Sequence, residues 1–247
     1  MKIFVAGASG AIGRRLVPLL VQAGHEVHGG TRGERGAAVL RALGATPCVA
    51  DVFDRDALHA TLRRSRPDVV IHQLTDLPPG LDPARMGDAI ARNARVRSEG
   101  TANLVAAALA SGCGRMVAQS IAWAYAPGDG ARRETDPLDL AAVGARATTV
   151  QGVAALEAAV LGTPALAGTV LRYGHLYGPG TGTGQTADPL RVHVDAAASA
   201  ALLALRPDAL GAFNICEPNE QVSPARAVDL LGWSAAFRLP EAAGSAR

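Results

Sequence analysis

Short runs of apolar and β-branched residues alternate with longer segments rich in alanine and leucine through most of the chain. Such runs are typical of strands buried on both faces of a parallel sheet, and the longer segments are typical of helices that cover it. The pattern predicts strands over 2–6, 26–31, 46–50, 68–74, 115–119, 169–172 and 213–216. It predicts helices over 12–23, 37–43, 54–64 (with Asp54 as N-cap), 86–110, 145–161 and 195–205, and a last helix opened by Ser223-Pro224.

This alternation predicts an α/β fold, a doubly wound parallel sheet of the Rossmann type with right-handed crossovers. At roughly 150 residues per domain, we expect residues 1–247 to form a single domain. About 174–190 and 213–247 would form its small, reduced substrate-side part. Gly174–Pro189 contains five glycines and two prolines, which predicts a loop over the C-terminal edge of the sheet.

A glycine-rich turn, Gly7-Ala8-Ser9-Gly10-Ala11-Ile12-Gly13, directly follows the first predicted strand and opens the first helix. Glycines allow a tight turn and a close approach of the backbone to a pyrophosphate, and the helix N-terminus offers free N–H groups to the phosphates. The alternative is a plain strand-to-helix turn. Position and context favour dinucleotide binding, by the residues Gly7, Ser9, Gly10, Ala11, Ile12 and Gly13.

The end of the second predicted strand indicates which dinucleotide is bound. A site selective for NAD usually carries Asp or Glu about 20 residues after the glycines, to bond the ribose 2′-hydroxyl. This chain has Thr31-Arg32 there, and a guanidinium suits a 2′-phosphate. We therefore expect Thr31 and Arg32 to favour NADP. NAD remains open, because Glu34 lies nearby and Arg32 could be a solvated loop residue.

Composition narrows the class of protein further. Of the 247 residues 49% are apolar and 19% are charged, with a net charge of +2, which excludes a disordered chain and argues against nucleic-acid binding. The longest stretch without charge, residues 100–114, is shorter than the roughly 20 apolar residues of a membrane span. Three separated cysteines suit a reducing cytoplasm, and no histidine or cysteine spacing predicts a metal site.

Several further motifs fall in the order of one known family. They are Gly7–Gly13, Asp51-Val52, Val70–Thr75, Gly100–Leu104, Gln119-Ser120, Leu171–Gly180, His193–Asp195 and Phe213–Ile215. On these residues the chain, from Met1 to about Pro218, resembles the extended and atypical short-chain dehydrogenase/reductases, the NAD-dependent epimerase/dehydratase family. The resemblance implies that Asp51 and Val52 lie against the adenine and that Leu74 and Thr75 line the cofactor. It also implies that Tyr173, Gly174, His175 and Leu176 pass the nicotinamide.

The chain departs from that family at its proton relay. The resemblance implies a tyrosine on the helix after the fifth strand, and a lysine four residues later. Aligning Glu157 with the acidic residue of that helix puts Thr149 and Val153 at these two positions. The only lysine is Lys2, and none of the three tyrosines (Tyr125, Tyr173 and Tyr177) is followed by a lysine four residues on. The usual relay is absent.

Two residues remain as candidates for catalysis. Ser120 matches the family serine that hydrogen-bonds a substrate oxygen, although a strand-end turn serine is the alternative. Tyr125 follows shortly after and could present a phenol, or could be a packing tyrosine. A water held by Ser120 and Thr149 is another route for the proton. His72 and His175 are expected near the cofactor, as structural histidines more than as bases.

Two functions remain open on the sequence. The first is an NAD(P)-dependent oxidoreductase, epimerase or dehydratase acting on an unidentified carbonyl or sugar-like compound. The second is a non-catalytic NADP-binding sensor or scaffold. The missing relay favours the sensor, whereas the retained Ser120, Tyr125 and cofactor-edge loop favour the enzyme, which we expect. Small residues on the helices over 86–110 and 145–161, together with the resemblance, imply a homodimer formed through these helices.

Overall fold

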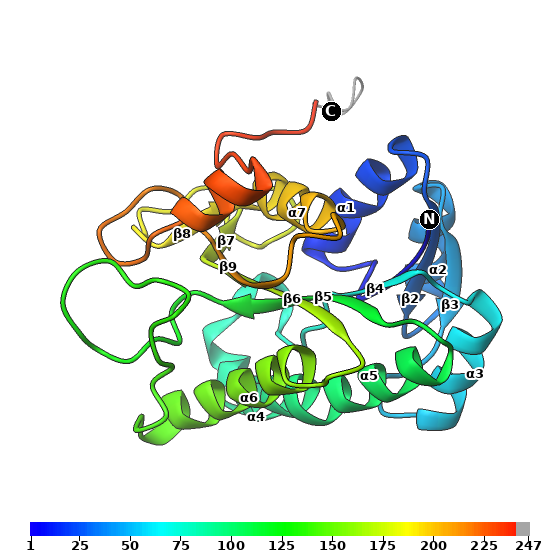
Figure 1. Cartoon of the computed structure of the whole chain (residues 1–247), viewed down its shortest axis with the longest axis horizontal. Coiled ribbons are helices and arrows are strands. Elements are labelled where there is room, and N and C mark those ends of the chain that lie inside the picture. The colour runs from blue at the N-terminus through cyan, green and yellow to red at the C-terminus, as the bar shows by residue number, and fades with distance from the viewer. Residues whose placement is uncertain (241–247) are drawn as a thin grey trace.

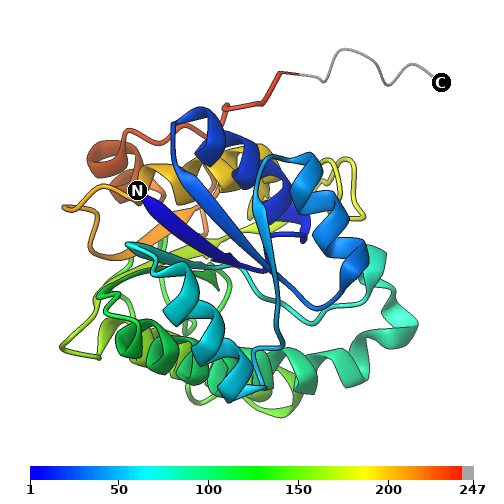
Figure 2. The same ribbon diagram turned by 90° about the vertical axis from the view of Figure 1, so that its right-hand side faces the viewer.

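The computed structural model describes residues 1–240, in which seven parallel strands form one twisted sheet (Figures 1 and 2). The strand order is β3-β2-β1-β4-β5-β6-β9. The chain therefore runs outward from β1 in one direction and then returns to continue from β4 in the other. Ligands of such sheets bind where the order reverses, outside the carboxyl ends of the strands. The strands are β1 (Lys2–Ala6), β2 (Glu26–Thr31), β3 (Thr46–Val49), β4 (Val69–His72), β5 (Arg115–Ile121), β6 (Ala167–Tyr173) and β9 (Gly211–Ile215).

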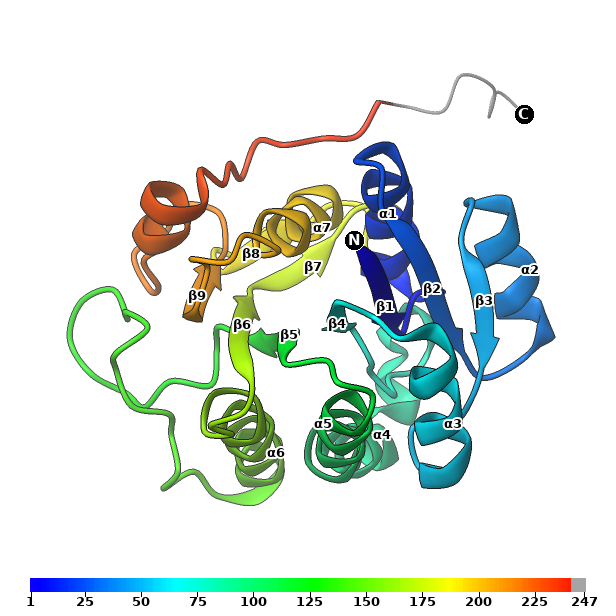
Figure 3. The ribbon, with the colours of Figure 1, turned by 45° about the vertical axis from the view of Figure 1, so that its right-hand side comes forward.

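Helices cover both faces of the sheet (Figure 3). Three lie on one face: α1 (Ala11–Gln22), α2 (Glu34–Ala42) and α7 (Val194–Leu203). Four lie on the other: α3 (Arg55–Ser65), α4 (Met86–Arg95), α5 (Thr101–Ala110) and α6 (Gly144–Leu161). The predicted doubly wound fold is thus confirmed, and Asp54 caps α3 by accepting a bond from the Ala57 N–H at 3.0 Å.

The first strand explains why the sheet needs both layers. Its side chains point alternately to the two faces. Ile3 and Val5 belong to the core beneath α1 and α7, whereas Phe4 and Ala6 belong to the core beneath α3 and α5. All four residues are buried, so the strand reads as a continuous apolar run in the sequence.

Two local predictions need correction. The helix expected over 86–110 is interrupted by a π-helical turn, η3 (Val96–Gly100), between α4 and α5. The segment 174–189, expected to be loop, contains β7 (His175–Tyr177), which pairs with β8 (Arg191–His193) in a second, two-stranded parallel sheet. The last helix begins at residue 225, directly after Ser223-Pro224 as predicted, and its main part is the π-helical turn η4 (Ala227–Leu231). None of the helices in residues 1–240 combines the length and apolarity needed to cross a membrane.

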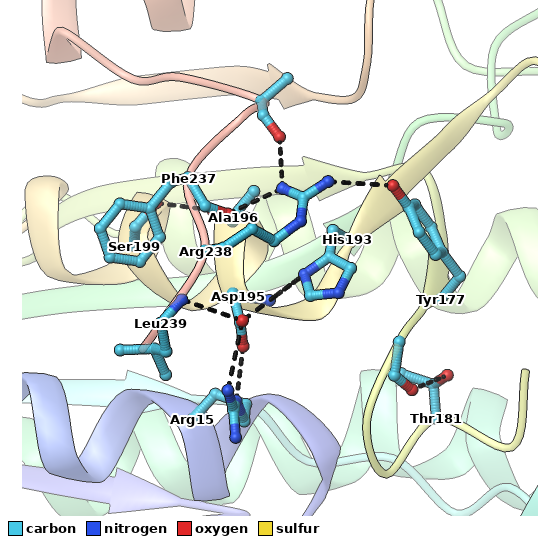
Figure 4. A network of polar contacts seen from close by, with 12 residues as sticks. Arg15, Tyr177, Thr181, His193, Asp195, Ala196, Ser199, Phe237, Arg238 and Leu239 are labelled. Atoms are coloured by element: carbon cyan, nitrogen blue, oxygen red, sulfur yellow. Dashed lines mark hydrogen bonds and ion pairs between the residues drawn. The ribbon is translucent and has the colours of Figure 1, made fainter. Parts of the chain in front are cut away.

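A buried carboxylate joins three distant segments on the α1 face (Figure 4). The Oδ1 atom of Asp195, at the start of α7, accepts a bond from Arg15 Nε of α1 at 2.5 Å. Its Oδ2 atom accepts from Arg15 Nη2 at 3.2 Å and from the Leu239 N–H at 3.0 Å. The Asp195 side chain is only 4% exposed, and these bonds replace the hydration that it loses on burial. The C-terminal segment is thereby fixed against the glycine-turn helix.

We expect Asp195→Ala to lower the free energy of unfolding by about 3 kcal/mol, because it leaves the Arg15 guanidinium and the Leu239 N–H without their acceptor. Urea denaturation monitored by circular dichroism measures the loss. The control is Asp208→Ala, since Asp208 pairs with Arg206 on the surface; its loss should stay below about 1 kcal/mol. Equal losses in the two variants would contradict the assigned role of Asp195.

Candidate active site

The glycine turn lies at the C-terminal edge of β1 and leaves the N-terminus of α1 open. Gly7 has a φ of +81°, and a Cβ atom there would lie 2.5 Å from the Gln73 carbonyl oxygen. At Gly13 a Cβ would lie 2.4 Å from the Ala8 carbonyl oxygen, so glycine lets α1 pack closely against the turn. Gly10 is the N-cap and provides no side chain to cap the helix. These residues therefore form a cradle that fits a pyrophosphate.

Thr31 and Arg32, the predicted ribose-side residues, lie at the end of β2. The Thr31 and Ser9 hydroxyl oxygens lie 3.2 Å apart, which ties the glycine turn to β2. Arg32 is exposed and has no ion-pair partner within residues 1–240. The Glu34 carboxylate bonds Arg41 Nη1 at 2.5 Å. The cation here is thus open to a ligand, while the nearby carboxylate already has a partner.

The next predicted cofactor residues follow β3 at the same edge. The Asp51 carboxylate accepts a bond from the Phe53 N–H at 2.9 Å, which shapes the turn before α3. Val52 is buried, and its carbonyl accepts from Asn103 Nδ2 of α5 at 3.1 Å.

Leu74 and Thr75 follow β4. The Leu74 N–H donates to His72 Nδ1 at 3.1 Å, and its carbonyl accepts from Gln119 Nε2 at 2.9 Å. Leu74 is half-buried and Thr75 is exposed. Asp51, Val52, Leu74 and Thr75 therefore lie along the edge where the sequence placed them, and their contacts with a cofactor stay a prediction.

The predicted catalytic serine is buried beside an ion pair. Ser120 Oγ donates to Glu157 Oε1 of α6 at 2.7 Å, and only 3% of the residue is exposed. Arg172 of β6 donates two hydrogen bonds to the same carboxylate, from Nε to Oε1 at 2.9 Å and from Nη2 to Oε2 at 2.6 Å. Both charged side chains are almost fully buried. The Ser120 hydroxyl is therefore one of the groups that satisfy Glu157.

Tyr125 is joined to the same cluster. Its hydroxyl donates to Asn214 Oδ1 of β9 at 2.6 Å and accepts from Arg172 Nη1 at 2.7 Å. Burial raises the pKa of the phenol to about 12, although the adjacent guanidinium opposes that rise. A general acid or base works best with a pKa near the working pH. The geometry thus favours a structural role for Tyr125, and its part in proton transfer stays a prediction.

No ionisable side chain takes the place of the missing relay on α6. Thr149 is half-buried, and Val153 is fully buried in a small cluster with Ala124 and Val150. His72 is fully buried at the end of β4, where its Nε2 lies 2.9 Å from Thr101 Oγ1. Burial, and then the nearby charge of Arg97, lower the pKa of His72 to about 4. The ring is therefore neutral at pH 7, and it has a structural role at the C-terminal end of β4.

The segment after β6 carries an arrangement that the sequence did not reveal. Tyr173 is buried and its hydroxyl donates to the Ala197 carbonyl at 3.2 Å. Two residues later, His175 Nδ1 lies 2.6 Å from Asp188 Oδ2, and the ring stacks on Trp123 with centroids 5.4 Å apart. Trp123 and Asp188 are distant in sequence and carry no motif, so only the folded chain brings them to His175.

The two residues that flank His175 have backbone and packing roles. A Cβ on Gly174 would lie 2.9 Å from the Leu190 carbonyl oxygen, so the chain passes close to the residue that precedes β8. Leu176 is half-buried and packs against the core beneath α1 and α7. Within residues 1–240 no group of three His, Cys, Asp or Glu side chains is arranged to hold a metal ion.

Comparison with known proteins identifies the family. The model of the NAD dependent epimerase/dehydratase family matches residues 3–205. A relative named 3-diazoavenalumate denitrifying reductase, from a Streptomyces species, is 38% identical over 100% of this chain and 92% of its own length. The chain therefore belongs to the NAD dependent epimerase/dehydratase family and is an enzyme of its oxidoreductase or epimerase type.

Solved structures agree on the fold. The UDP-glucose 4-epimerase of Thermotoga maritima superposes with a TM-score of 0.74 at 20% identity, covering 94% of this chain and 93% of its own. The UDP-glucose-4-epimerase of Stenotrophomonas maltophila, solved with bound NAD, gives a TM-score of 0.75 at 19% identity, covering 96% and 94%. At such identities the likeness concerns the fold alone.

We expect Tyr125→Phe to lower the free energy of unfolding by about 1–3 kcal/mol, because Asn214 Oδ1 and an Arg172 N–H lose a buried partner. Urea denaturation measures this loss. Tyr177→Phe is the control, since Tyr177 is only half-buried and should cost less.

The raised pKa adds a pH signature. The phenol stays neutral to a higher pH in the folded state than in the unfolded state. Its contribution to the free energy of unfolding is therefore complete below about pH 10 and is lost as the pH rises towards 12. Wild-type stability should therefore fall more steeply above pH 10 than that of Tyr125→Phe. Parallel curves would contradict the buried position of the phenol.

Proposed function

We propose that this enzyme is a nicotinamide-dependent reductase that transfers a hydride without a tyrosine–lysine proton relay, and that its substrate carries an aromatic diazonium group. The observation behind this proposal is that the predicted site lacks a free proton donor on α6 and after β5. Thr149 and Val153 occupy the relay positions, and the Ser120 and Tyr125 hydroxyls are engaged by the Glu157–Arg172 pair.

The described residues fit a dinucleotide cofactor. The open N-terminus of α1 at Gly10 would hold the pyrophosphate, Arg32 would hold a 2′-phosphate after β2, and the nicotinamide half would extend over β4, β5 and β6. When bound in its reduced form, such a cofactor supplies a hydride. The role of the protein is then to orient the two reactants and to exclude water from the edge.

A diazonium substrate suits a site of this kind because its reduction needs no acid. Hydride attacks the aryl carbon, a C–H bond forms, and the C–N bond breaks with its electron pair leaving on dinitrogen. The carbon is reduced by two electrons, the nicotinamide is oxidised by two, and no proton is taken up. Reduction of a carbonyl, in contrast, places negative charge on an oxygen that must be protonated, which is the task of the missing relay.

The relative named 3-diazoavenalumate denitrifying reductase supports this substrate class, because it is 38% identical over the whole of this chain. Its name describes removal of nitrogen from a diazo compound. The carbonyl or sugar-like substrates expected from the family remain the alternative enzyme function. A cofactor-binding sensor without turnover is the alternative of another class.

The test uses 4-carboxybenzenediazonium labelled with ¹⁵N and NADPH deuterated at C4. We expect the protein to accelerate NADPH oxidation, release labelled N2 in equal amount, and place deuterium on the aryl carbon. Gly10→Val is the control, since a branched side chain fills the space for the pyrophosphate and should return the rate to the uncatalysed background. Turnover of a carbonyl or sugar-nucleotide panel instead would contradict the diazonium proposal, and cofactor binding without any turnover would favour the sensor.

Selectivity for NADPH over NADH is a further part of the proposal. We expect Arg32→Ala to weaken NADPH binding by about 10-fold or more, because a charge-assisted bond to the 2′-phosphate is lost. NADH affinity of the same variant, measured by fluorescence titration, is the internal control and should not change. Equal affinities for the two cofactors in the wild-type protein would contradict the role of Arg32.

Pairing of two copies through α4, α5 and α6 stays a prediction. Within one chain, α6 packs against α4 and α5. Light scattering at micromolar concentration measures the oligomeric state directly.

A further inference from the structure

A buried cation lies in the π-helical turn between α4 and α5 without a partner of its own. Arg97 is 8% exposed, and within residues 1–240 its guanidinium makes no hydrogen bond and no ion pair. None of its nitrogens is among the fully buried atoms that lack a partner, so the residue is largely covered while its N–H donors still reach solvent. Burial lowers the pKa of Arg97 to about 10, so the group is still charged at pH 7. Buried charges are normally paired, because an unpaired one loses its hydration without compensation. π-helical turns themselves occur frequently at functional sites.

The helix places Arg97 against the segment that follows β4. Asn93, Arg97 and Thr101 follow one another four residues apart from α4 through the π-helical turn to α5, and all three are buried. Asn93 Oδ1 accepts a bond from the Asp76 N–H at 3.0 Å, and Thr101 Oγ1 lies 2.9 Å from His72 Nε2. Arg97 lies between them and therefore faces residues 72–76. Its charge also lowers the pKa of His72, as this position requires.

Among residues 1–240, no carboxylate forms an ion pair with Arg97. Asp76, the acidic residue of the 72–76 segment, has its carboxylate 3.4 Å from Arg92 Nε instead. Arg95 and Glu99, the charged neighbours on the same helix, bond each other at 2.7 Å on the surface. The guanidinium consequently keeps its donors available at the edge of the sheet.

The position of Arg97 indicates what kind of group it receives. In the proposed orientation of the cofactor, the pyrophosphate lies at Gly10 and the 2′-phosphate at Arg32, so the negative charges of the cofactor lie at β1 and β2. The nicotinamide ring and its ribose, which would lie over β4 to β6, carry no anionic oxygen. We propose that Arg97 binds an anionic oxygen of the substrate, a carboxylate or phenolate, and thereby orients the substrate beside the nicotinamide.

This inference rests on the proposed cofactor orientation but not on the reacting group of the substrate. It assigns to Arg97 a positioning role that the family motifs in the sequence do not contain. A guanidinium with planar, fixed donors suits a carboxylate, which it can bond through two N–H groups at once. The guanidinium of Arg97, which has no ion-pair partner in the free protein, then acquires one when the substrate binds.

The test measures binding without turnover, so that its outcome is independent of the diazonium assay. Isothermal titration of the protein loaded with NADP⁺ compares cinnamate, a planar aromatic carboxylate, with its neutral counterpart cinnamamide. We expect the wild-type protein to prefer cinnamate, and Arg97→Met to lose cinnamate affinity by about 10- to 100-fold while cinnamamide affinity stays unchanged. Arg97→Lys, which keeps the charge, should recover part of the preference. Arg95→Met on the same helix is the matched control and should bind like wild type.

Thermal unfolding separates this role from a structural one. Because Arg97→Met removes an unpaired buried charge, we expect its midpoint to equal or exceed that of wild type. A midpoint lowered by several degrees with the carboxylate preference intact would mean that Arg97 is structural, and would overturn the proposal. A loss of NADP⁺ affinity without a change in the cinnamate preference would assign the guanidinium to the cofactor instead. Absence of any carboxylate preference in the wild-type protein would also overturn it.

Discussion

The buried ion pair between Glu157 and Arg172 determines what the centre of this molecule can do. It joins α6 to β6 beneath the predicted site. Because both ions are removed from water, their remaining donor and acceptor groups need hydrogen-bond partners from the protein. Ser120 supplies one donor, Tyr125 supplies one acceptor, and the Glu134 carbonyl accepts from Arg172 at 3.2 Å. These two hydroxyls are therefore hydrogen-bonded to the ion pair, which favours a structural role for them.

The shortage of free polar groups also limits the chemistry that the C-terminal edge of the sheet can support. With Val153 in the hydrophobic cluster beneath α6 and His72 neutral and hydrogen-bonded, no side chain on these elements is poised as an acid at pH 7. A reaction in which hydride is added and a neutral molecule departs places no such demand on the protein. In the proposed arrangement, the guanidinium of Arg97 provides a positive charge that orients the bound reactant.

Sequence and structure agree most closely where one physical signal determines an element. The strands 2–6 and 26–31 are found with the predicted bounds, because each is a run of residues buried in the sheet. The π-helical turn at Val96–Gly100 was not predicted, since apolar periodicity does not distinguish a helix with one inserted residue from a regular one. The pairing of β7 with β8 was missed for a related reason. Both strands are three residues long, and the glycines around them are typical of loops.

The sequence by itself determined the fold, the glycine cradle and the loss of the tyrosine–lysine relay, because each of these is a property of neighbouring residues or of a count. The tertiary structure alone decided which polar groups are free. Ser120 was predicted as a catalytic group from its place after a strand, and only the packing of α6 on β5 brings Glu157 to its hydroxyl. Arg97 carries no sequence signal, because an arginine becomes distinctive only when the fold buries it and leaves it without a partner.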